Sequence, residues 1–114
     1  RIRNIAHLGV ATYGWGFRNR GLSVPEPAPH VQLTAPSGAI WDWNRPAEGQ
    51  TAASAVVGTA VEFAQVTTQV RNLADTALWV TGEPAASWME IAQCFAGPPE
   101  DPPAPGTRFR AVAS

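Results

Sequence analysis

The stretch from Gly58 to Arg71, GTAVEFAQVTTQVR, constrains the fold most, because it reads as a capped amphipathic helix. Thr59 followed three residues later by Glu62 is a capping box, in which the hydroxyl accepts from the Glu62 amide and the carboxylate reaches back to the Thr59 amide. The helix is expected to begin at Thr59 and to end near Asn72, with Arg71 complementing the dipole of its last turn. Its apolar stripe, which needs a sheet to pack on, consists of Ala60, Phe63, Ala64, Thr67 and Val70.

Short β-prone segments lie on both sides of this helix. The first two are separated by the turn sequence Pro36-Ser37-Gly38 and alternate apolar with polar residues, which predicts a hairpin. A second helix opens after Pro84, a residue that suits a first turn. We therefore expect an α+β domain whose sheet of three or four strands is mainly antiparallel and is covered by helices 59–71 and 84–96. The expected strands are 30–35, 39–44, 52–57 and 77–81.

The first part of the chain reads as a helix interrupted by glycines. Gly9, Gly14 and Gly16 each cost up to ~1 kcal/mol of helix stability relative to Ala, so close packing against a neighbouring helix is expected to compensate. Prolines then mark a linker, and a proline-rich tail with few large apolar residues is expected to be extended or disordered. The expected organisation is a helix at 1–21, a linker at 22–29, the α+β domain at 30–97 and the tail at 98–114.

Composition argues against several classes of partner. The 114 residues include eight Arg, no Lys and nine acids, for a formal net charge of -1, so the basic surface that nucleic acids require is missing. No apolar run approaches the ~20 residues of a membrane span. A single Cys cannot form an internal disulfide, which fits a cytoplasmic protein. Because the chain begins at Arg1 rather than Met, we expect it to be part of a longer protein.

Few residues suggest chemistry. His7 and His30 have no His, Asp, Glu or Cys at ligand spacing, so no metal site is expected within this chain. Cys94 has no histidine close in sequence and is expected to be an inert, buried or half-buried thiol. Trp41 and Trp43 can form an aromatic binding wall, although aromatic residues at strand spacing more often belong to a core.

Several blocks carry a resemblance to a known family, over residues 1 to about 99. They are HLGVAT from His7, VQLTAPSGAIWDW from Val31, VVGTAVEF from Val56, TQVR from Thr68, ADTAL from Ala74 and WMEIAQCFAGPP from Trp88. The chain closely resembles the C-terminal portion of an actinobacterial group related to the mycothiol-dependent maleylpyruvate isomerases, some members of which carry the label "wyosine base formation". That label would demand RNA binding, against which the lysine-free composition argues.

This resemblance implies a parent protein in two parts. An upstream helical bundle would bind a divalent metal, zinc in the first instance, and would use mycothiol, while this chain would be a domain shaped like a sterol carrier protein. Residues 1–21 would be the last helix of that bundle or its connector. In the isomerases an arginine of the downstream domain faces the active site, and the TQVR block makes Arg71 the nearest match. Many relatives carry a second basic residue where this chain has Val70.

The leading hypothesis is an accessory domain of a metal- and mycothiol-dependent isomerase or transferase, itself inactive and without a cofactor. It would shape the substrate cleft, and Arg71 would hold a carboxylate through its planar fork or would serve only the helix end. The alternative is a non-catalytic module that binds an apolar ligand or dimerises through the first helix. Its tunnel would be lined by Trp41, Trp43, Phe63 and Trp79.

Overall fold

A mixed four-stranded sheet, in the order β2-β1-β3-β4, forms one layer of the protein in a computed structural model that describes residues 1–106. The strands are β1 (His30–Thr34), β2 (Ile40–Trp43), β3 (Ala55–Thr59) and β4 (Trp79–Thr81). The predicted hairpin is present, with Val31 opposite Trp43 and Thr34 opposite Ile40. β4 pairs antiparallel with β3, whereas β3 runs parallel to β1. The predicted α+β class is therefore confirmed, with one parallel pairing inside a mainly antiparallel sheet.

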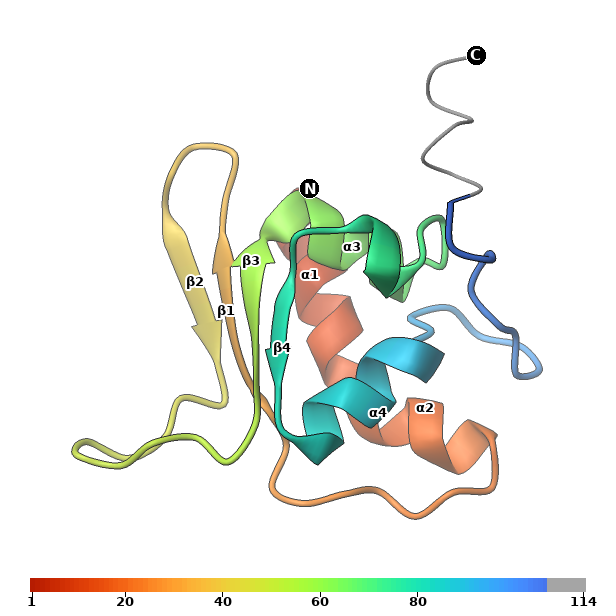
Figure 1. Ribbon diagram of the computed structural model, residues 1–114, viewed down its shortest axis with the longest axis horizontal. Coiled ribbons are helices and arrows are strands. Elements are labelled where there is room, and N and C mark those ends of the chain that lie inside the picture. The colour runs from red at the N-terminus through yellow and green to blue at the C-terminus, as the bar shows by residue number, and fades with distance from the viewer. Residues whose placement is uncertain (107–114) are drawn as a thin grey trace.

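Within residues 1–106, four helices lie on one side of this sheet, as Figure 1 shows. They are α1 (Ile2–Ala11), α2 (Tyr13–Asn19), α3 (Ala60–Thr67) and α4 (Glu83–Ile91), and a short 3-10 helix, η1 (Leu73–Asp75), precedes β4. α3 and α4 pack on the strands, α1 packs on α3, and α2 packs on α4. Edge-to-face contacts join Tyr13, Phe63 and Trp88 from three of these helices. The sheet contributes Val31, Leu33 and Val56, each fully buried, to the same core. No helix formed by residues 1–106 lies on the opposite face of the sheet.

The N-terminal segment differs from the single helix expected over 1–21. It breaks at Thr12, whose hydroxyl donates to the carbonyl of Leu8 at 2.9 Å, and α2 then follows as a separate helix. The neighbouring helix predicted for the glycines is present for Gly9, where it is α3 of the same domain, but not for Gly14, whose Cβ would meet only Arg18 of its own helix, or for Gly16, whose Cβ would meet nothing within 4 Å. A Cβ added at Gly9 would lie 2.9 Å from Phe63 and 3.0 Å from Thr67. The glycine thus allows α1 to approach α3 directly.

The capping box of α3 is confirmed in its main contact. The hydroxyl of Thr59 accepts from the Glu62 amide at 3.2 Å, and it also donates to the Glu62 carboxylate, which does not reach the Thr59 amide.

The C-terminal end of α3 differs from the prediction, which places it near Asn72. α3 ends at Thr67, because Gln69 adopts a positive φ of 61° and the amide of Val70 donates to the carbonyl of Gln65 at 2.9 Å.

The second predicted helix also ends early. Pro84 lies in the first turn of α4 as expected, but the helix stops at Ile91 rather than at residue 96. Residues 98–106 of the tail are irregular and are hydrogen-bonded to the domain, so this part is not disordered. The prediction for 107–114 falls outside the residues that the structure describes. Among residues 1–106, no helix has the length and apolarity needed to cross a membrane.

Candidate functional site

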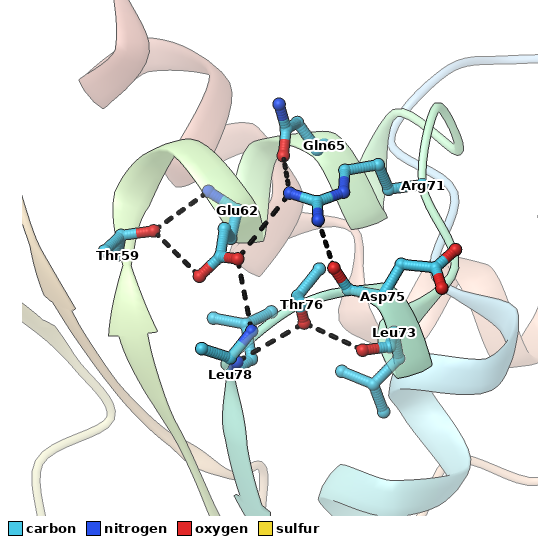
Figure 2. Close-up of polar contacts among 9 residues, drawn as sticks. Thr59, Glu62, Gln65, Arg71, Leu73, Asp75, Thr76 and Leu78 are labelled. Carbon is cyan, nitrogen blue, oxygen red and sulfur yellow. Dashed lines mark hydrogen bonds and ion pairs between the residues drawn. The ribbon is translucent and has the colours of Figure 1, made fainter. Parts of the chain in front are cut away.

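Arg71 lies beyond the end of α3 and not in its last turn, so the helix-dipole role expected for it does not apply. Figure 2 shows its guanidinium between α3 and the segment that leads into β4. Nη1 donates to Gln65 Oε1 at 3.0 Å and lies 3.6 Å from a carboxylate oxygen of Glu62, while Nη2 donates to the carbonyl of Asp75. Nε is buried and has no hydrogen-bond partner among residues 1–106. The side chain is 20% exposed.

Glu62 links three parts of this cluster. Its carboxylate accepts from the Thr59 hydroxyl, accepts from the amide of Ala77 at 3.1 Å and pairs with Arg71 (Figure 2). The capping role predicted for Glu62 therefore accounts for only part of what it does. Together, Arg71 and Glu62 tie both ends of α3 to the segment before β4, which makes them a brace within the domain.

The four aromatic residues expected to line one tunnel lie on two faces of the sheet. Trp41 and Trp43 stand opposite the buried Leu33 and Val31, so they lie on the helix-covered face. Phe63 is fully buried in the core on that side. Trp79 stands opposite Val57 on the uncovered face and is 67% exposed. The structure therefore does not bring these four side chains together.

The uncovered face carries a polar cluster that the sequence analysis missed. His30 and Asp42 form a hydrogen bond of 2.7 Å between Nε2 and Oδ1, and each side chain is 17% exposed. Arg45 donates to the other carboxylate oxygen at 3.1 Å, and Gln32 donates to Oδ1 at 3.4 Å. Partial burial raises the pKa of Asp42, but the hydrogen bonds from His30, Arg45 and Gln32, with the positive charge of Arg45, outweigh it and lower the pKa overall.

A shallow hollow of about 380 Å³ lies beside this cluster. His30 and Trp79 line it together with Val57 and Thr81 of the sheet and part of the loop that joins β2 to β3. The hollow therefore combines an exposed indole, aliphatic side chains and an imidazole that Asp42 orients. Such a mixture suits a small ligand or the side chains of a neighbouring domain.

The pairing of His30 with Asp42 could have been found from the predicted hairpin. Once the turn is placed at residues 36–38, the antiparallel register brings Asp42 opposite Gln32, and His30 is then its diagonal neighbour on the same face. A comparison of ligand spacing along the chain alone could not show this, because the two residues are twelve positions apart.

The remaining chemical candidates lie apart from this hollow. His7 of α1 accepts a hydrogen bond from Trp43 at 3.3 Å. Cys94 is half-buried, and burial raises the pKa of its thiol more than a hydrogen bond with Thr67 lowers it. Within residues 1–106, no three His, Cys, Asp or Glu side chains come together as metal ligands could.

Comparison with known proteins shows that the chain is similar to part of two longer proteins. Two proteins of Mycobacterium tuberculosis, from strains CDC 1551 / Oshkosh and ATCC 25618 / H37Rv, are each 42% identical to it over 99 residues, and both are named as uncharacterized. The match covers 87% of this chain but 37% of each relative, so the chain spans less than half the length of the curated relatives it matches. No known family and no solved structure matches the chain.

Proposed function

We propose that this chain is the downstream accessory domain of a longer cytoplasmic protein resembling the mycothiol- and metal-dependent isomerases and transferases. It forms one wall of the substrate cleft and carries out no catalysis by itself. The observation that carries the proposal is the uneven cover of the sheet: helices pack on one face, and the other presents Trp79 at 67% exposure beside a hollow of about 380 Å³. The greater length of the mycobacterial relatives supports a larger parent.

The uncovered face suits contact with another domain. Exposed large apolar side chains beside polar groups are typical of interaction surfaces, and ligand sites are frequent where two domains meet. Trp79 supplies apolar area, while His30, which lines the same hollow and is held by Asp42, supplies a polar group beside it. In this proposal the metal ligands and the mycothiol site belong to the upstream part of the parent, since the described residues offer no ligand set.

The role that this proposal gives to Arg71 differs from the substrate-binding role that the resemblance implies. Its Nη atoms already contact Gln65, Glu62 and the carbonyl of Asp75. A substrate carboxylate would therefore have to displace Glu62 before it could meet the guanidinium fork. The contacts favour a bracing role for Arg71 over direct substrate binding.

The proposal is tested by replacing Trp79 with Ala in both the isolated chain and the longer protein. Because Trp79 is largely exposed here, its loss should change the unfolding midpoint of the isolated chain little. In the longer protein it should lower the midpoint and the activity, since the upstream part would lose its contact. Val70→Ala, another exposed apolar position at 44%, is the matched control and should be silent in both. Equal effects of Trp79→Ala in the two proteins would disprove the proposed contact.

The hollow itself favours a second candidate, a module that binds a small apolar ligand without catalysis. Trp79 and Val57 offer an apolar surface, and His30 lines the same hollow. Titration of the isolated chain with an apolar fluorescent dye should then show saturable binding that Trp79→Ala abolishes. Self-association through α1, where Leu8 is 48% exposed, is the other form of this candidate, and light scattering at high concentration measures it.

A further inference from the structure

The proline-rich segment after α4 is seated on the domain. Residues 97–106 contain five prolines and form neither helix nor strand. In Figure 1 they pass from the end of α4 beside the end of α2 and then toward the turn that follows α3. Proline has no amide hydrogen, so a segment of this kind cannot satisfy its own carbonyls as a helix or sheet does. Its carbonyls need donors from elsewhere.

Side chains from several elements supply those donors. Their contacts are directed at backbone atoms of the segment, and every neutral donor is a side-chain amide. Asn19 donates to the carbonyl of Gly97 at 3.2 Å, Gln93 to Pro98 at 3.1 Å, Gln69 to Glu100 at 2.7 Å and Asn72 to Pro103 at 3.2 Å, and Arg20 also donates to Glu100. These side chains thus hold the segment through the backbone carbonyls of four of its residues.

Gln93 shows that this surface is built for an extended chain. Its side chain is almost fully buried, at 2% exposed, and both ends of its amide contact the segment or its approach. Nε2 donates to the carbonyls of Phe95 and Pro98, and Oε1 accepts from the amide of Glu100 at 3.0 Å. Burial of an amide is costly without such partners. The segment therefore supplies hydrogen-bond partners for the buried amide of Gln93, as a bound peptide would.

Charge adds selectivity at one point. Arg20, whose side chain is 18% exposed, forms an ion pair of 3.1 Å with Asp101. Further along, the carboxylate of Asp75 accepts from the amide of Gly106 at 2.8 and 2.9 Å. A suitable occupant is therefore extended, rich in proline and acidic near its middle.

We propose that the ends of α2, α3 and α4 form a docking groove for an extended, acidic, proline-rich peptide recognised through its backbone, and that residues 97–106 occupy this groove in cis as an exchangeable ligand. Recognition of such segments by fixed donors is a known mode of peptide binding, because the extended proline-rich chain loses little entropy when it docks. A segment of the same kind on a partner protein can then compete with the chain's own tail.

Amide hydrogen exchange on the unmodified chain gives the first test. The amides of Glu100 and Gly106 donate to Gln93 and Asp75, so they should exchange at least tenfold more slowly than in the free peptide 97–106. They should also exchange at least tenfold faster than the amide of Val56 in the central strand β3, because the segment leaves by local opening. Either of two results would overturn the proposal: exchange as fast as in the free peptide, or exchange that occurs only with the global unfolding seen at Val56.

The second test presents the peptide in trans. A variant of the 114-residue chain with Glu100→Pro and Asp101→Lys loses the amide that contacts Gln93 and reverses the charge that meets Arg20, so its own tail should leave the groove. The synthetic peptide GPPEDPPAPG, which copies residues 97–106, should then bind this variant in an NMR titration. The same peptide with Glu100→Pro should bind at least tenfold more weakly, and so should the wild-type peptide when the protein also carries Gln93→Met. Equal binding of both peptides would refute backbone recognition, and exchange data on the unmodified chain decide the question if the variant does not fold.

Discussion

Replacing Arg71 with Ala in the isolated chain distinguishes a brace from a substrate-binding residue. The change removes the hydrogen bonds to Gln65 and to the carbonyl of Asp75, and it removes the ion pair with Glu62. Hydrogen bonds that involve a charged group contribute about 1.5–3 kcal/mol each when well shielded. Solvent screening at the 20% exposed side chain and the 3.6 Å separation from Glu62 reduce that sum. We expect Arg71→Ala to lower the free energy of unfolding by about 3 kcal/mol.

This loss is a large fraction of the free energy of unfolding of a typical domain, which is ~5–15 kcal/mol, but it should leave the chain folded. At about 4 °C per kcal/mol for a domain of this size, the Tm should fall by about 10–15 °C. Urea unfolding followed by tryptophan fluorescence measures the free energy, and thermal unfolding followed by circular dichroism measures the Tm. Arg3→Ala is the control, because Arg3 is exposed and its guanidinium makes a cation–π contact, 5.6 Å from the centroid of the Trp41 ring.

Two further variants sharpen the test. Arg71→Lys should recover less than half of the loss, because an ammonium can approach Glu62 but cannot also bridge Gln65 and Asp75 in one plane. In a double-mutant cycle, Arg71→Ala and Glu62→Ala should couple by about 1 kcal/mol. If Arg71→Ala has the same free energy of unfolding as the Arg3→Ala control, the contacts of Arg71 do not stabilise the domain. The role of Arg71 in binding a substrate carboxylate in the longer protein is then favoured. Steady-state kinetics and metal analysis of the longer protein then measure that role.

Three other predictions follow from close packing, burial and charge. Gly9→Ala should cost about 1–3 kcal/mol in urea unfolding, because its Cβ would lie 2.9 Å from Phe63, whereas Gly16→Ala meets no side chain within 4 Å and should be neutral or stabilising. Alkylation of Cys94 at pH 8 should be several-fold slower in the folded chain than in urea, because burial raises the pKa of the thiol; equal rates would contradict this. Since the pKa of Asp42 is lowered below 3.8 by folding, its stabilising contribution is present above that value and is lost as the pH falls through the folded pKa. The stability difference between wild type and Asp42→Asn should therefore shrink between pH 5 and pH 3.

The features that were predictable from sequence depend on short-range signals. Thr59 and Glu62 are three positions apart, and the hairpin around residues 36–38 joins adjacent strands, so neither needs knowledge of distant contacts. The parallel pairing of β1 with β3 is different. The loop from Asn44 to Ser54 returns the chain to the start of β1, and only the packed sheet determines on which side β3 is added. No local pattern reports this choice.

Helix ends were the weakest part of the prediction, and Gln69 shows the reason. A helix commonly stops where a glycine adopts positive φ, but here a glutamine does so. The side-chain amide of Gln69 donates to the carbonyl of Ala92, just after α4, and to the carbonyl of Glu100 in the tail. The cost of the left-handed conformation is offset by contacts with segments more than twenty positions away. Sequence alone places the stop at Asn72, which instead caps η1 through a hydrogen bond from Ala74 at 2.9 Å.

The position of Arg71 beyond α3 affects how any loss of activity in the longer protein is interpreted. Its partner Glu62 accepts from the amide of Ala77, and Trp79 begins β4 two residues later, so the brace also fixes where the exposed indole stands. Removing Arg71 can therefore disturb the uncovered face without any contact between Arg71 and a substrate. If Arg71 contacts the substrate, Arg71→Ala should lower activity further in a protein that already carries Trp79→Ala. If its effect is transmitted through β4, Arg71→Ala should cause no further loss once Trp79 has been replaced. Kinetics of the two single variants and the double variant separate these mechanisms.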